Sequence, residues 1–432
     1  MKNSKAIVVE KKYLVPFVLI TSLFAMWGFA NDITNPMVAA FKTVMEITNF
    51  KASMIQFAFY GGYATMAIPA ALIIKKYSYK MGIIVGLSLY AVGALLFFPA
   101  AQFEVFGFFL VSLYILTFGL AFLETTANPY ILSMGDEETA TRRLNLAQSF
   151  NPMGSILGMF VASKVILSAL DSDKRDAAGN LIFDTMTAAE KAVVRTHDLG
   201  IIRNPYVILG FVVLAMLVVI ALYKMPKRAE AVHEIHAWDS FKNLIGNIKY
   251  REGVIAQVFY VGAQIMCWTF IIQYADNLGI PKAEAQDYNI VAMAIFIASR
   301  FISTFLMKYL NSRLMLTMFA IGGMITTTGV ILIQGMPGLY LLVATSAFMS
   351  LMFPTIYGIA LGGLKDDATL GAAGLVMAIV GGALMPPLQG WIIDQGTILS
   401  MPAVNFSFLL PFICFIVIAI YGYRTLKVYP EL

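Results

Sequence analysis

The sequence contains few charged residues and few of the side chains that build disulfide or metal sites. Asp, Glu, Lys and Arg make up 13% of its 432 residues, against roughly 25% in a soluble domain. Its two cysteines, Cys267 and Cys414, both lie within apolar segments, so neither a disulfide framework nor a metal site is expected. None of its histidines lies inside an apolar segment, which excludes a histidine proton relay there.

Motifs of the common enzyme and pump classes are also absent. The sequence has no Walker lysine loop, no Gly-x-Ser-x-Gly and no His-Glu-x-x-His. Neither an enzyme nor an ATP-driven pump is therefore indicated, and no cofactor is expected. The net charge of +5 comes from basic residues in loops, where they orient a membrane chain. Nucleic acid is for this reason not expected as a partner.

What the sequence has in abundance is long apolar runs. Hydrophobic residues make up 59% of the chain, and the runs are about 20 residues long, the length that crosses a bilayer as a helix. They are not segments of about ten residues in which apolar and polar side chains alternate, as the strands of a membrane β-barrel are. We predict an all-α, multi-pass membrane protein with twelve transmembrane helices, over the ranges 13–41, 52–74, 81–100, 105–134, 142–168, 202–224, 253–275, 285–307, 314–334, 337–364, 370–393 and 403–424.

The basic residues predict the orientation of the chain. Most of the 30 Lys and Arg residues fall at the two ends of the chain and in the loops on the same side of the membrane as those ends. Both termini are therefore predicted to be cytoplasmic. The first apolar run is too long for the core of a signal peptide, so we expect it to be retained. The loop 169–201 is predicted to be external, with a short helix near 188–195.

A second long loop divides the chain. The basic stretch 225–250 is predicted to be a cytoplasmic linker between two six-helix halves, residues 1–224 and 251–432. The halves resemble each other weakly, because Asn128-Pro129 in the fourth span has a counterpart in Phe353-Pro354 of the tenth. Repeats of this kind in transporters place a binding site near the membrane midplane, between the halves.

Two carboxylates lie deep inside apolar spans, Asp32 in the first and Glu124 in the fourth. A charge near the bilayer centre costs roughly 3 kcal/mol, so such residues persist mainly where they face a polar cavity. Both acids are expected to be neutralised by protonation when substrate binds. Two isolated acids favour a secondary transporter over a channel, because pores more often show rings of charge.

Amide side chains accompany both acids at helical spacing. Two of them share a helix face with Asp32, one follows Glu124 by one turn, and the fifth span adds more at steps of three. A single amide more often joins helices by a hydrogen bond. Acids with amides on three helices favour a shared polar cavity instead. The amides are Asn31, Asn35, Asn128, Asn145, Gln148 and Asn151.

Three of these asparagines are followed by a proline. Pro36, Pro129 and Pro152 each leave the carbonyl four residues earlier without its helical partner and tend to kink the helix. Unpaired backbone at membrane depth is tolerated where it lines protein or water, so each kink adds an acceptor beside a polar side chain. The alternative is that the prolines only shape the helix bundle.

The second half offers a different lining. Tyr260, Gln264 and Trp268 lie at steps of four in the seventh span, and Tyr357 follows one turn after Pro354. Aromatic rings on one face can stack on the apolar side of a sugar while an amide binds its hydroxyls. Such stripes are more often packing. Two further charged residues lie inside spans. Arg300 is expected to pair with a loop acid or to snorkel rather than to bind substrate, and Lys164 is expected to snorkel at the outer end of the fifth span.

Several blocks of the sequence are similar to one known family. The chain resembles the fucose/proton symporter family of the major facilitator superfamily, whose members include glucose/galactose and N-acetylglucosamine carriers, and the resemblance covers nearly the whole chain. It implies alternating access driven by the proton gradient, with Glu124 in coupling and recognition and with Gln148 and Asn151 on sugar hydroxyls. The blocks are Trp27-Gly-Phe-Ala-Asn31, Phe59-Tyr-Gly-Gly-Tyr63, Leu123-Glu-Thr-Thr-Ala-Asn-Pro-Tyr130, Arg143-Leu-Asn-Leu-Ala-Gln-Ser-Phe-Asn151, Tyr260-Val-Gly-Ala-Gln264 and Phe353-Pro-Thr-Ile356.

The sequence departs from the family pattern at one place. Fucose symporters carry an aspartate at the position of Asn35 and an asparagine at the position of Asp32, so the carboxylate here is shifted by three residues. Since both positions share a helix face, Asp32 can do the same work from one turn away. The alternatives are that Glu124 alone carries the proton, that coupling is altered, or that the substrate differs.

Together these observations predict a monomeric symporter in the inner membrane of a bacterium, with protons, membrane lipid and a small neutral sugar as partners. L-fucose is the first expectation for the sugar, and glucose, galactose or N-acetylglucosamine is the alternative. A membrane sensor or scaffold that kept the fold without transporting is the third possibility. The predicted proton-coupling residues are Asp32 and Glu124, and the predicted substrate-binding residues are Trp27, Asn31, Asn35, Asn128, Gln148, Asn151, Tyr260, Gln264, Trp268 and Tyr357.

Overall fold

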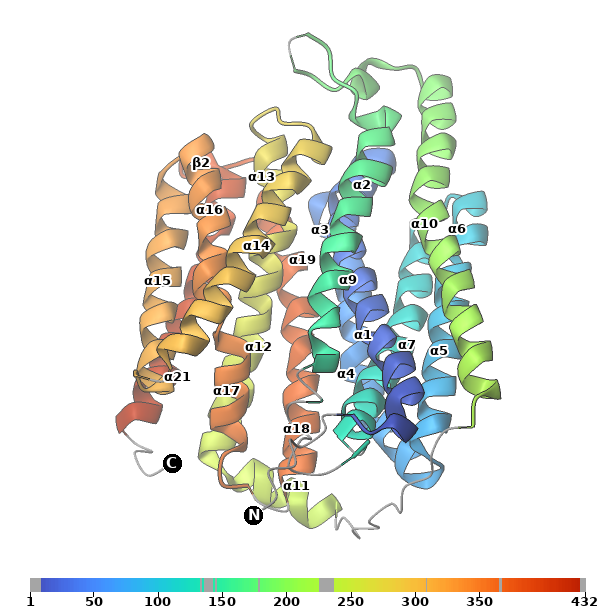
Figure 1. The fold of residues 1–432 in the computed structure, drawn as a ribbon. Coiled ribbons are helices and arrows are strands. Elements are labelled where there is room, and N and C mark those ends of the chain that lie inside the picture. Colours follow the sequence, from blue (N-terminus) through green and yellow to red (C-terminus); the bar gives the residue numbers. More distant parts are fainter. Residues whose placement is uncertain are drawn as a thin grey trace, which may run out of the picture. The chain divides into compact units, whose positions relative to one another are not determined.

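The computed structural model describes residues 9–132, 134–135, 143, 146–177, 179–224, 237–307, 309–364 and 367–427. Within these ranges the ordered elements are helices (Figure 1), except for one short antiparallel pair, β1 (Thr397–Ile398) and β2 (Met401–Pro402), and an isolated bridge between Arg175 and Leu181. The first part of the predicted linker 225–250 lies outside the described residues, which resume at Ala237.

The helices have the following bounds. In the first part of the chain they are α1 (Leu14–Thr34), α2 (Met37–Val44), α3 (Asn49–Ala52), α4 (Met54–Lys76), α5 (Tyr79–Leu95), α6 (Phe97–Phe103), α7 (Phe106–Leu132), α9 (Phe150–Val161) and α10 (Ala188–Leu222). In the second part they are α11 (Ala237–Gly246), α12 (Ile248–Thr269), α13 (Ile271–Asp276), α14 (Lys282–Leu306), α15 (Ser312–Leu332), α16 (Met336–Met349), α17 (Met352–Leu361), α18 (Ala368–Met377), α19 (Gly381–Ile393), α20 (Ala403–Ser407) and α21 (Leu409–Lys427).

Helices of membrane-spanning length and composition account for most of the chain. Ten helical segments among the described residues are long and apolar enough to cross a membrane. Two further helices, α4 with 23 residues and α14 with 25, also have the length of a span. They correspond to the predicted second and eighth spans. The prediction of an all-helical, multi-pass architecture is therefore confirmed.

The first predicted span is interrupted where the sequence indicates. α1 ends at Thr34 and α2 begins at Met37, so the helix breaks at the Asn35–Pro36 pair. α9 begins at Phe150 after a turn, which places Pro152 in the first turn of the helix, where a missing N–H costs little. α7 continues through residue 129 to Leu132, so the proline at that position does not end the helix.

One predicted boundary is wrong. The loop 169–201 was expected to contain a separate short helix near 188–195, followed by a span that begins at 202, but α10 is one continuous helix from Ala188 to Leu222. The helix begins at a capping box, in which the Thr187 N–H donates to Glu190 Oε2 (2.8 Å) and the Glu190 N–H donates to Thr187 Oγ1 (3.4 Å). The polar first turns of α10 therefore extend the apolar span.

The described helices group into two compact units. Unit 1 draws on the ranges Met1–Thr34, Thr65–Ala162 and Leu199–His233, and unit 2 draws on Asn35–Ala64, Ser163–Asp198 and Glu234–Leu432. Each unit has its own buried core, and each is described by itself below. The break between α1 and α2 coincides with a unit boundary, so Asp32 belongs to unit 1 and Asn35 to unit 2.

Close helix packing organises unit 1. A Cβ atom added to Gly154 of α9 would lie 1.8 Å from the Ala25 carbonyl oxygen of α1, so these two helices touch through their backbones. The ring of Tyr206 on α10 stacks on Phe97 at 3.9 Å between centroids, and its hydroxyl lies 3.0 Å from Thr34 Oγ1. Small residues that let helices approach closely are typical of membrane helix pairs.

α12 is the central helix of unit 2. It packs against α16, α17, α19 and α21, and Figure 1 shows it among these helices. A Cβ atom added to Gly381 would lie 1.9 Å from the Val258 carbonyl oxygen, which is the same kind of close approach as in unit 1. Near the start of α12, the Tyr250 hydroxyl donates to the Gly371 carbonyl (2.8 Å).

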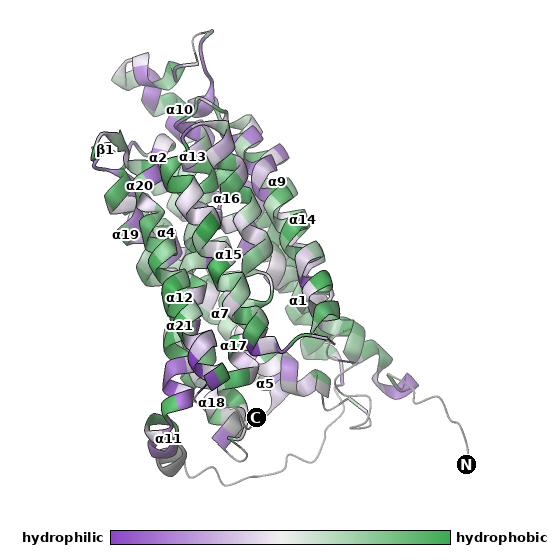
Figure 2. Ribbon diagram, turned by 90° about the vertical axis from the view of Figure 1, so that its left-hand side faces the viewer, coloured by the Kyte–Doolittle hydropathy of each residue, from purple (hydrophilic) through white to green (hydrophobic). Residues whose placement is uncertain are grey.

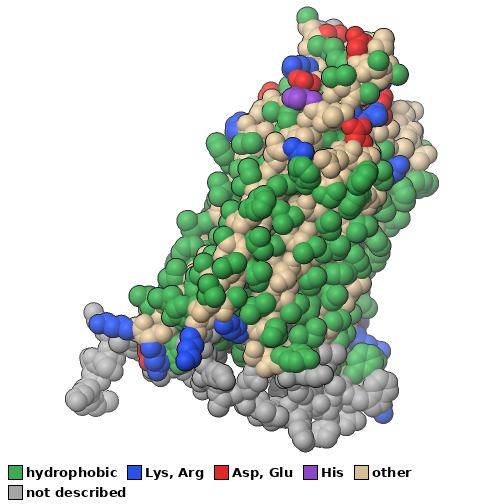
Figure 3. Space-filling view, turned by 90° about the vertical axis from the view of Figure 1, so that its right-hand side faces the viewer, with side chains coloured by type: hydrophobic (Ala, Val, Ile, Leu, Met, Phe, Trp, Pro, Cys, Tyr) green, Lys and Arg blue, Asp and Glu red, His purple; other side chains and the backbone are tan. Residues whose placement is uncertain are grey.

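The outer faces of the helices are apolar. Figure 2 shows that hydrophobic residues dominate along helices such as α12, α15 and α16. On α10, the side chains of Ile208, Phe211 and Leu222 are all more than half exposed. Figure 3 shows such side chains over the middle of one face, with charged side chains gathered toward its two ends. A membrane interior would cover this apolar band.

Candidate functional site

The segment from Trp27 to Thr34 carries the polar residues of α1. Asp32 is 1% exposed, which is unusual for a carboxylate. Asn31 and Trp27 are partly buried, and the Trp27 ring lies 6.3 Å from the ring of Phe24. The first predicted acid is therefore enclosed by protein in unit 1.

The contact between α1 and α9 places Asn151 beside this segment. A Cβ atom added to Gly28 would lie 2.1 Å from the Asn151 carbonyl oxygen, so only glycine fits at this crossing. The side chain of Asn151 donates from Nδ2 to the Phe24 carbonyl at 3.3 Å. Asn151 thus lies against the backbone of α1 at Phe24 and Gly28, which are close to Trp27 in the sequence.

A second polar group surrounds Glu124 on α7. Asn128 donates from Nδ2 to the Glu124 carbonyl (3.2 Å), and Gln148 donates from Nε2 to Asn128 Oδ1 (3.0 Å). Glu124 is partly buried, and its Oε2 is fully buried with no hydrogen-bond partner within the described part of the chain. Burying a charged oxygen without a donor is costly, and protonation removes that charge. This environment suits an acid that carries a proton.

The family block that contains Gln148 and Asn151 is described in part. Arg143 is fully buried and donates from Nε to the Ile131 carbonyl at 2.8 Å. Residues 144 and 145 of the block lie outside the described residues. The Gln148 side chain is exposed, so it is accessible beside Asn128 in unit 1.

The predicted aromatic residues of unit 2 have their polar atoms engaged within the protein. The Tyr260 hydroxyl donates to the Met349 carbonyl at 3.1 Å, and Trp268 Nε1 donates to Ser346 Oγ at 3.1 Å. Both side chains are buried. Tyr357 is partly buried and stacks on Phe353 with 6.2 Å between ring centroids. These rings hold α12 against α16 and stack within α17.

The other predicted residues of unit 2 are Gln264 and Asn35. Gln264 is partly buried on α12. Asn35 is 3% exposed, and its Oδ1 accepts from Gln56 Nε2 of α4 at 3.1 Å. The predicted site residues therefore fall into two groups, one in unit 1 around α1, α7 and α9 and one in unit 2, on α12, on α17 and at Asn35 between α1 and α2.

The sequence analysis missed a group of buried amides and one threonine in unit 2. The side chain of Gln56 also donates to Thr269 Oγ1 (2.9 Å), and Asn289 on α14 donates from Nδ2 to the Trp268 carbonyl (3.0 Å) and to Gln286 Oε1 (3.3 Å). Gln286 and Asn289 are three residues apart in a predicted span. This spacing, which puts both amides on one helix face, was the available signal in the sequence.

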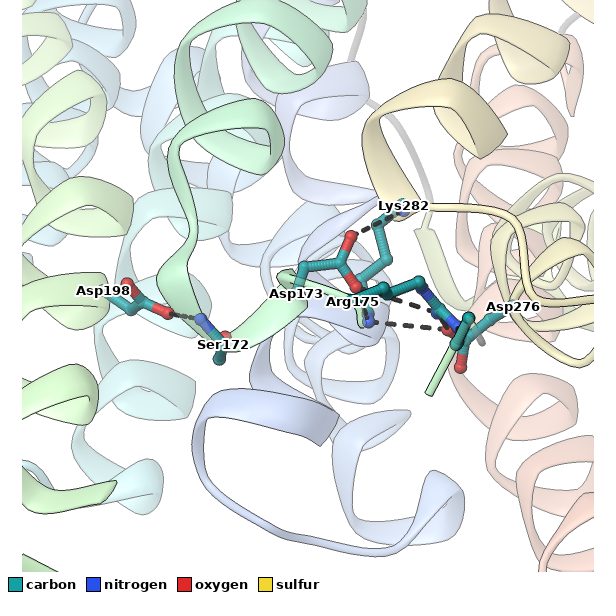
Figure 4. A network of polar contacts seen from close by, with 7 residues as sticks. Ser172, Asp173, Arg175, Asp198, Asp276 and Lys282 are labelled. Atoms are coloured by element: carbon teal, nitrogen blue, oxygen red, sulfur yellow. Dashed lines mark hydrogen bonds and ion pairs between the residues drawn. The ribbon is translucent and has the colours of Figure 1, made fainter. Parts of the chain in front are cut away.

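The sequence analysis also missed a buried ionic network, which Figure 4 shows. Lys282 at the start of α14 donates from Nζ to Asp173 Oδ1 (2.6 Å), and its backbone N–H donates to Asp173 Oδ2 (2.7 Å). Arg175 pairs with Asp276 at the end of α13. Lys282 is 1% exposed. Buried charges are tolerated when they are paired in this way.

Other polar contacts join the same parts of unit 2. Asp394 at the end of α19 accepts from the backbone N–H groups of Asn49 and Phe50 at 2.8 Å each. Lys164, which was expected to snorkel, is instead paired with Asp287 at 2.6 Å. The predicted Arg300 donates from Nε to the Ser350 carbonyl at 3.0 Å. Segments distant in sequence are thus tied together by charged groups.

Comparisons with known proteins identify the family. Residues 18–379 match the model of the Major Facilitator Superfamily. The chain is 69% identical to the L-fucose-proton symporter of Haemophilus influenzae over 98% of this chain and 99% of that one. It is 35% identical to the L-fucose-proton symporter of Escherichia coli over 96% and 93% of the two chains.

A solved structure agrees with these matches. The crystal structure of the Major Facilitator Superfamily transporter FucP in the outward conformation is 34% identical and aligns with a TM-score of 0.69 over 96% of this chain and 99% of that one. Matches of this extent cover both described units. The chain therefore belongs to the fucose/proton symporter family of the Major Facilitator Superfamily, which is a family of membrane transporters and not of enzymes.

Proposed function

We propose that this protein is a secondary active transporter that imports L-fucose together with protons by alternating access. The observation that carries the proposal is the environment of Glu124, whose buried Oε2 has no donor among the described residues while Asn128 and Gln148 are hydrogen-bonded beside it. An acid that can be neutralised next to amides that can bind hydroxyls is what proton-coupled sugar transport requires. The high identity to an L-fucose-proton symporter supports the choice of sugar.

The two acids have coupling roles in this proposal, and the amides and aromatic rings bind the sugar. Asp32 and Glu124 take up protons together with the sugar and release them on the other side. Amides hydrogen-bond the sugar hydroxyls, and aromatic rings cover its apolar face. The proposed substrate-binding residues are Trp27, Asn31, Asn35, Asn128, Gln148, Asn151, Tyr260, Gln264, Trp268 and Tyr357.

Asp32 acts in place of the aspartate that other fucose symporters carry at the position of Asn35. The burial of Asp32 within unit 1 supports this assignment, because a carboxylate is unlikely to be retained at 1% exposure without a function. Asn35 keeps a polar role, since its Oδ1 accepts from Gln56. The coupling function has thus moved by one helical turn.

The proposed topology follows the basic residues. Residues 1–224 and 251–432 form the two six-helix halves, 225–250 is the cytoplasmic linker, and both termini are cytoplasmic. The protein works as a monomer in the inner membrane of a bacterium. Under this orientation the ionic network around Asp173 and Lys282 lies on the external side.

A second candidate substrate is glucose or galactose. The chain is 31% identical to a glucose/galactose transporter of Brucella abortus over 96% of this chain and 94% of that one. Relative to other fucose symporters, the acid and the amide at positions 32 and 35 are exchanged, and this exchange is the feature of the chain that favours a different substrate. This candidate ranks second because identity to the L-fucose-proton symporters is higher.

Uptake by proteoliposomes distinguishes the candidates. Purified protein is reconstituted, and uptake of labelled L-fucose is measured in competition with unlabelled L-fucose, D-glucose, D-galactose and N-acetylglucosamine. We expect L-fucose to compete best. Stronger competition by D-glucose or D-galactose would identify that sugar, rather than L-fucose, as the substrate. Sugar binding without any uptake or counterflow would indicate a sensor rather than a transporter.

A further inference from the structure

Several buried amides that were not predicted from the sequence lie on packed helices of unit 2. We call them the amide cluster: Gln273 of α13 and Gln286 and Asn289 of α14, two helices that pack against each other, together with Gln56 of α4 and Thr269 at the end of α12. Hydrogen bonds connect Gln56 to Thr269 and Asn289 to Gln286. Gln273 follows Thr269 by four residues, which is about one helical turn.

Every member of the amide cluster is almost completely removed from solvent. Exposure ranges from 0% for Gln56 and Gln286 to 5% for Gln273. Most buried amides in proteins use their hydrogen-bonding groups, because an unpaired buried group loses its bonds to water without compensation. A fully buried amide with free groups therefore destabilises the fold and needs a reason.

Several groups of the cluster have no hydrogen-bond partner among the described residues. Gln56 Oε1 and Asn289 Oδ1 lack donors, Gln286 Nε2 lacks an acceptor, and Gln273 lacks a partner at both Oε1 and Nε2. The free groups thus include both donors and acceptors. A sugar hydroxyl can donate and accept at once, and adjacent hydroxyls match the oxygen and nitrogen of one amide. An anion would match only the free donors, and a cation would match only the free acceptors.

The positions of the cluster connect it with predicted site residues. Gln56 donates to Asn35 Oδ1, and Asn289 donates to the carbonyl of Trp268. Asn35 and Trp268 were both predicted to bind substrate from the sequence alone. The cluster therefore extends the predicted unit 2 site along α13 and α14, where no residue had been assigned.

We infer that the amide cluster is a second subsite for sugar hydroxyls, in which Gln273 and Gln286 contact the substrate directly. The cluster is closed in this structure, so the sugar reaches it when α4 separates from α12. The hydrogen bond from Gln56 to Thr269 then opens, and sugar hydroxyls take the free groups of the cluster. The inference rests on the proposed function, because it assigns further residues to the same substrate.

The test replaces Gln273, the member of the cluster whose two amide atoms both lack a partner among the described residues. Gln273→Met keeps the shape of the side chain and removes both free groups. The matched control is Gln257→Met on α12, because Gln257 is also fully buried with both amide atoms unpaired within the described residues but lies outside the cluster. Each variant is measured for L-fucose affinity by calorimetry and for thermal stability in detergent.

We expect Gln273→Met to weaken L-fucose binding about tenfold, as loss of a hydrogen bond to substrate would. Its thermal stability should be unchanged or higher, because a buried amide without partners has been removed. Gln257→Met should gain or keep stability in the same way without losing affinity. If Gln273→Met binds L-fucose with unchanged affinity, the inference is overturned, and the unpaired amide atoms of Gln273 are concluded to bind buried water rather than sugar. Equal losses in both variants would also overturn it.

Monodeoxy sugars separate direct contact from an indirect effect. In the wild-type protein, at least one L-fucose analogue that lacks a single hydroxyl should bind about tenfold more weakly than L-fucose, and Gln273→Met should not distinguish that analogue from L-fucose. If Gln273→Met is destabilised, Gln286→Met is measured in the same way. If every such analogue loses the same factor in wild type and in both variants, the direct contact is refuted. If wild-type protein binds no L-fucose but binds another sugar, the proposed substrate fails instead, and the test is repeated with that sugar.

Discussion

The ion pair between Lys282 and Asp173 should contribute strongly to the stability of unit 2. Lys282→Met removes the cation and leaves the Asp173 carboxylate, which is 8% exposed, in place. Removing one partner of a buried pair typically costs about 3–5 kcal/mol. The Lys282 backbone N–H still donates to Asp173 Oδ2, and Arg175 lies 3.9 Å from Oδ1. These remaining contacts place the expected loss at the lower end, about 3 kcal/mol.

The free energy of unfolding of purified protein, from denaturant titration in detergent, measures this loss. Lys174→Met is the matched control, because Lys174 lies in the same loop and pairs with Asp171 while its side chain is 68% exposed. That surface pair should contribute at most about 1 kcal/mol. A loss in Lys282→Met no larger than the loss in Lys174→Met would refute the assignment of a buried, stabilising network.

A double variant isolates the interaction from the two side chains. Asp173→Asn removes the charge that Lys282→Met leaves unpaired, so the double variant should lose at least about 1 kcal/mol less than the sum of the single variants. Full additivity would show that the two groups do not interact. In transport assays Lys282→Met should also favour the state in which α13 and α14 separate from the 169–185 segment, because the network stabilises their contact.

Three further predictions concern the coupling acids and the helix contacts. Asp32→Asn should abolish concentrative uptake of L-fucose by proteoliposomes, and adding Asn35→Asp should restore part of it; full activity of Asp32→Asn would show that the shifted acid is incidental. Glu124→Gln keeps the shape but cannot carry a proton, so uptake should lose its response to a pH gradient while counterflow remains; an unchanged response would remove Glu124 from coupling. Gly154→Val should prevent folding of unit 1, because its Cβ would lie 1.8 Å from a backbone oxygen of α1, whereas Gly107→Ala meets nothing within 4 Å and should express normally.

Much of the fold could be predicted from the sequence, because the bilayer imposes a simple length rule on apolar helices. The break at Asn35–Pro36 was also predictable, since proline removes a backbone donor. The start of α10 was missed because hydropathy falls in its polar first turns. The signal that marks it, Thr187 three residues before Glu190, is a capping box and not an apolar pattern.

The polar residues of the candidate site in unit 1 could be predicted from the sequence, whereas the amide cluster in unit 2 could not. The acids Asp32 and Glu124 are conspicuous in apolar spans, and the hydrogen bond from Gln148 to Asn128 joins two amides that were predicted to share a polar cavity. The amide cluster was not predictable in the same way, because a single glutamine in a span is usually structural. Its significance depends on which atoms lack partners, and this depends on tertiary packing. The pairing of Lys282 with Asp173 likewise joins residues 109 positions apart.

In the proposed function, a proton gradient drives accumulation of L-fucose by this protein. The most direct measurement is uptake of labelled L-fucose by proteoliposomes with an imposed pH gradient and after the gradient is collapsed by a protonophore. Symport of one proton predicts accumulation of up to about tenfold per unit of pH gradient, since one pH unit is worth about 1.4 kcal/mol. Accumulation should disappear when the gradient collapses. Accumulation of L-fucose that persists without the gradient would contradict the account.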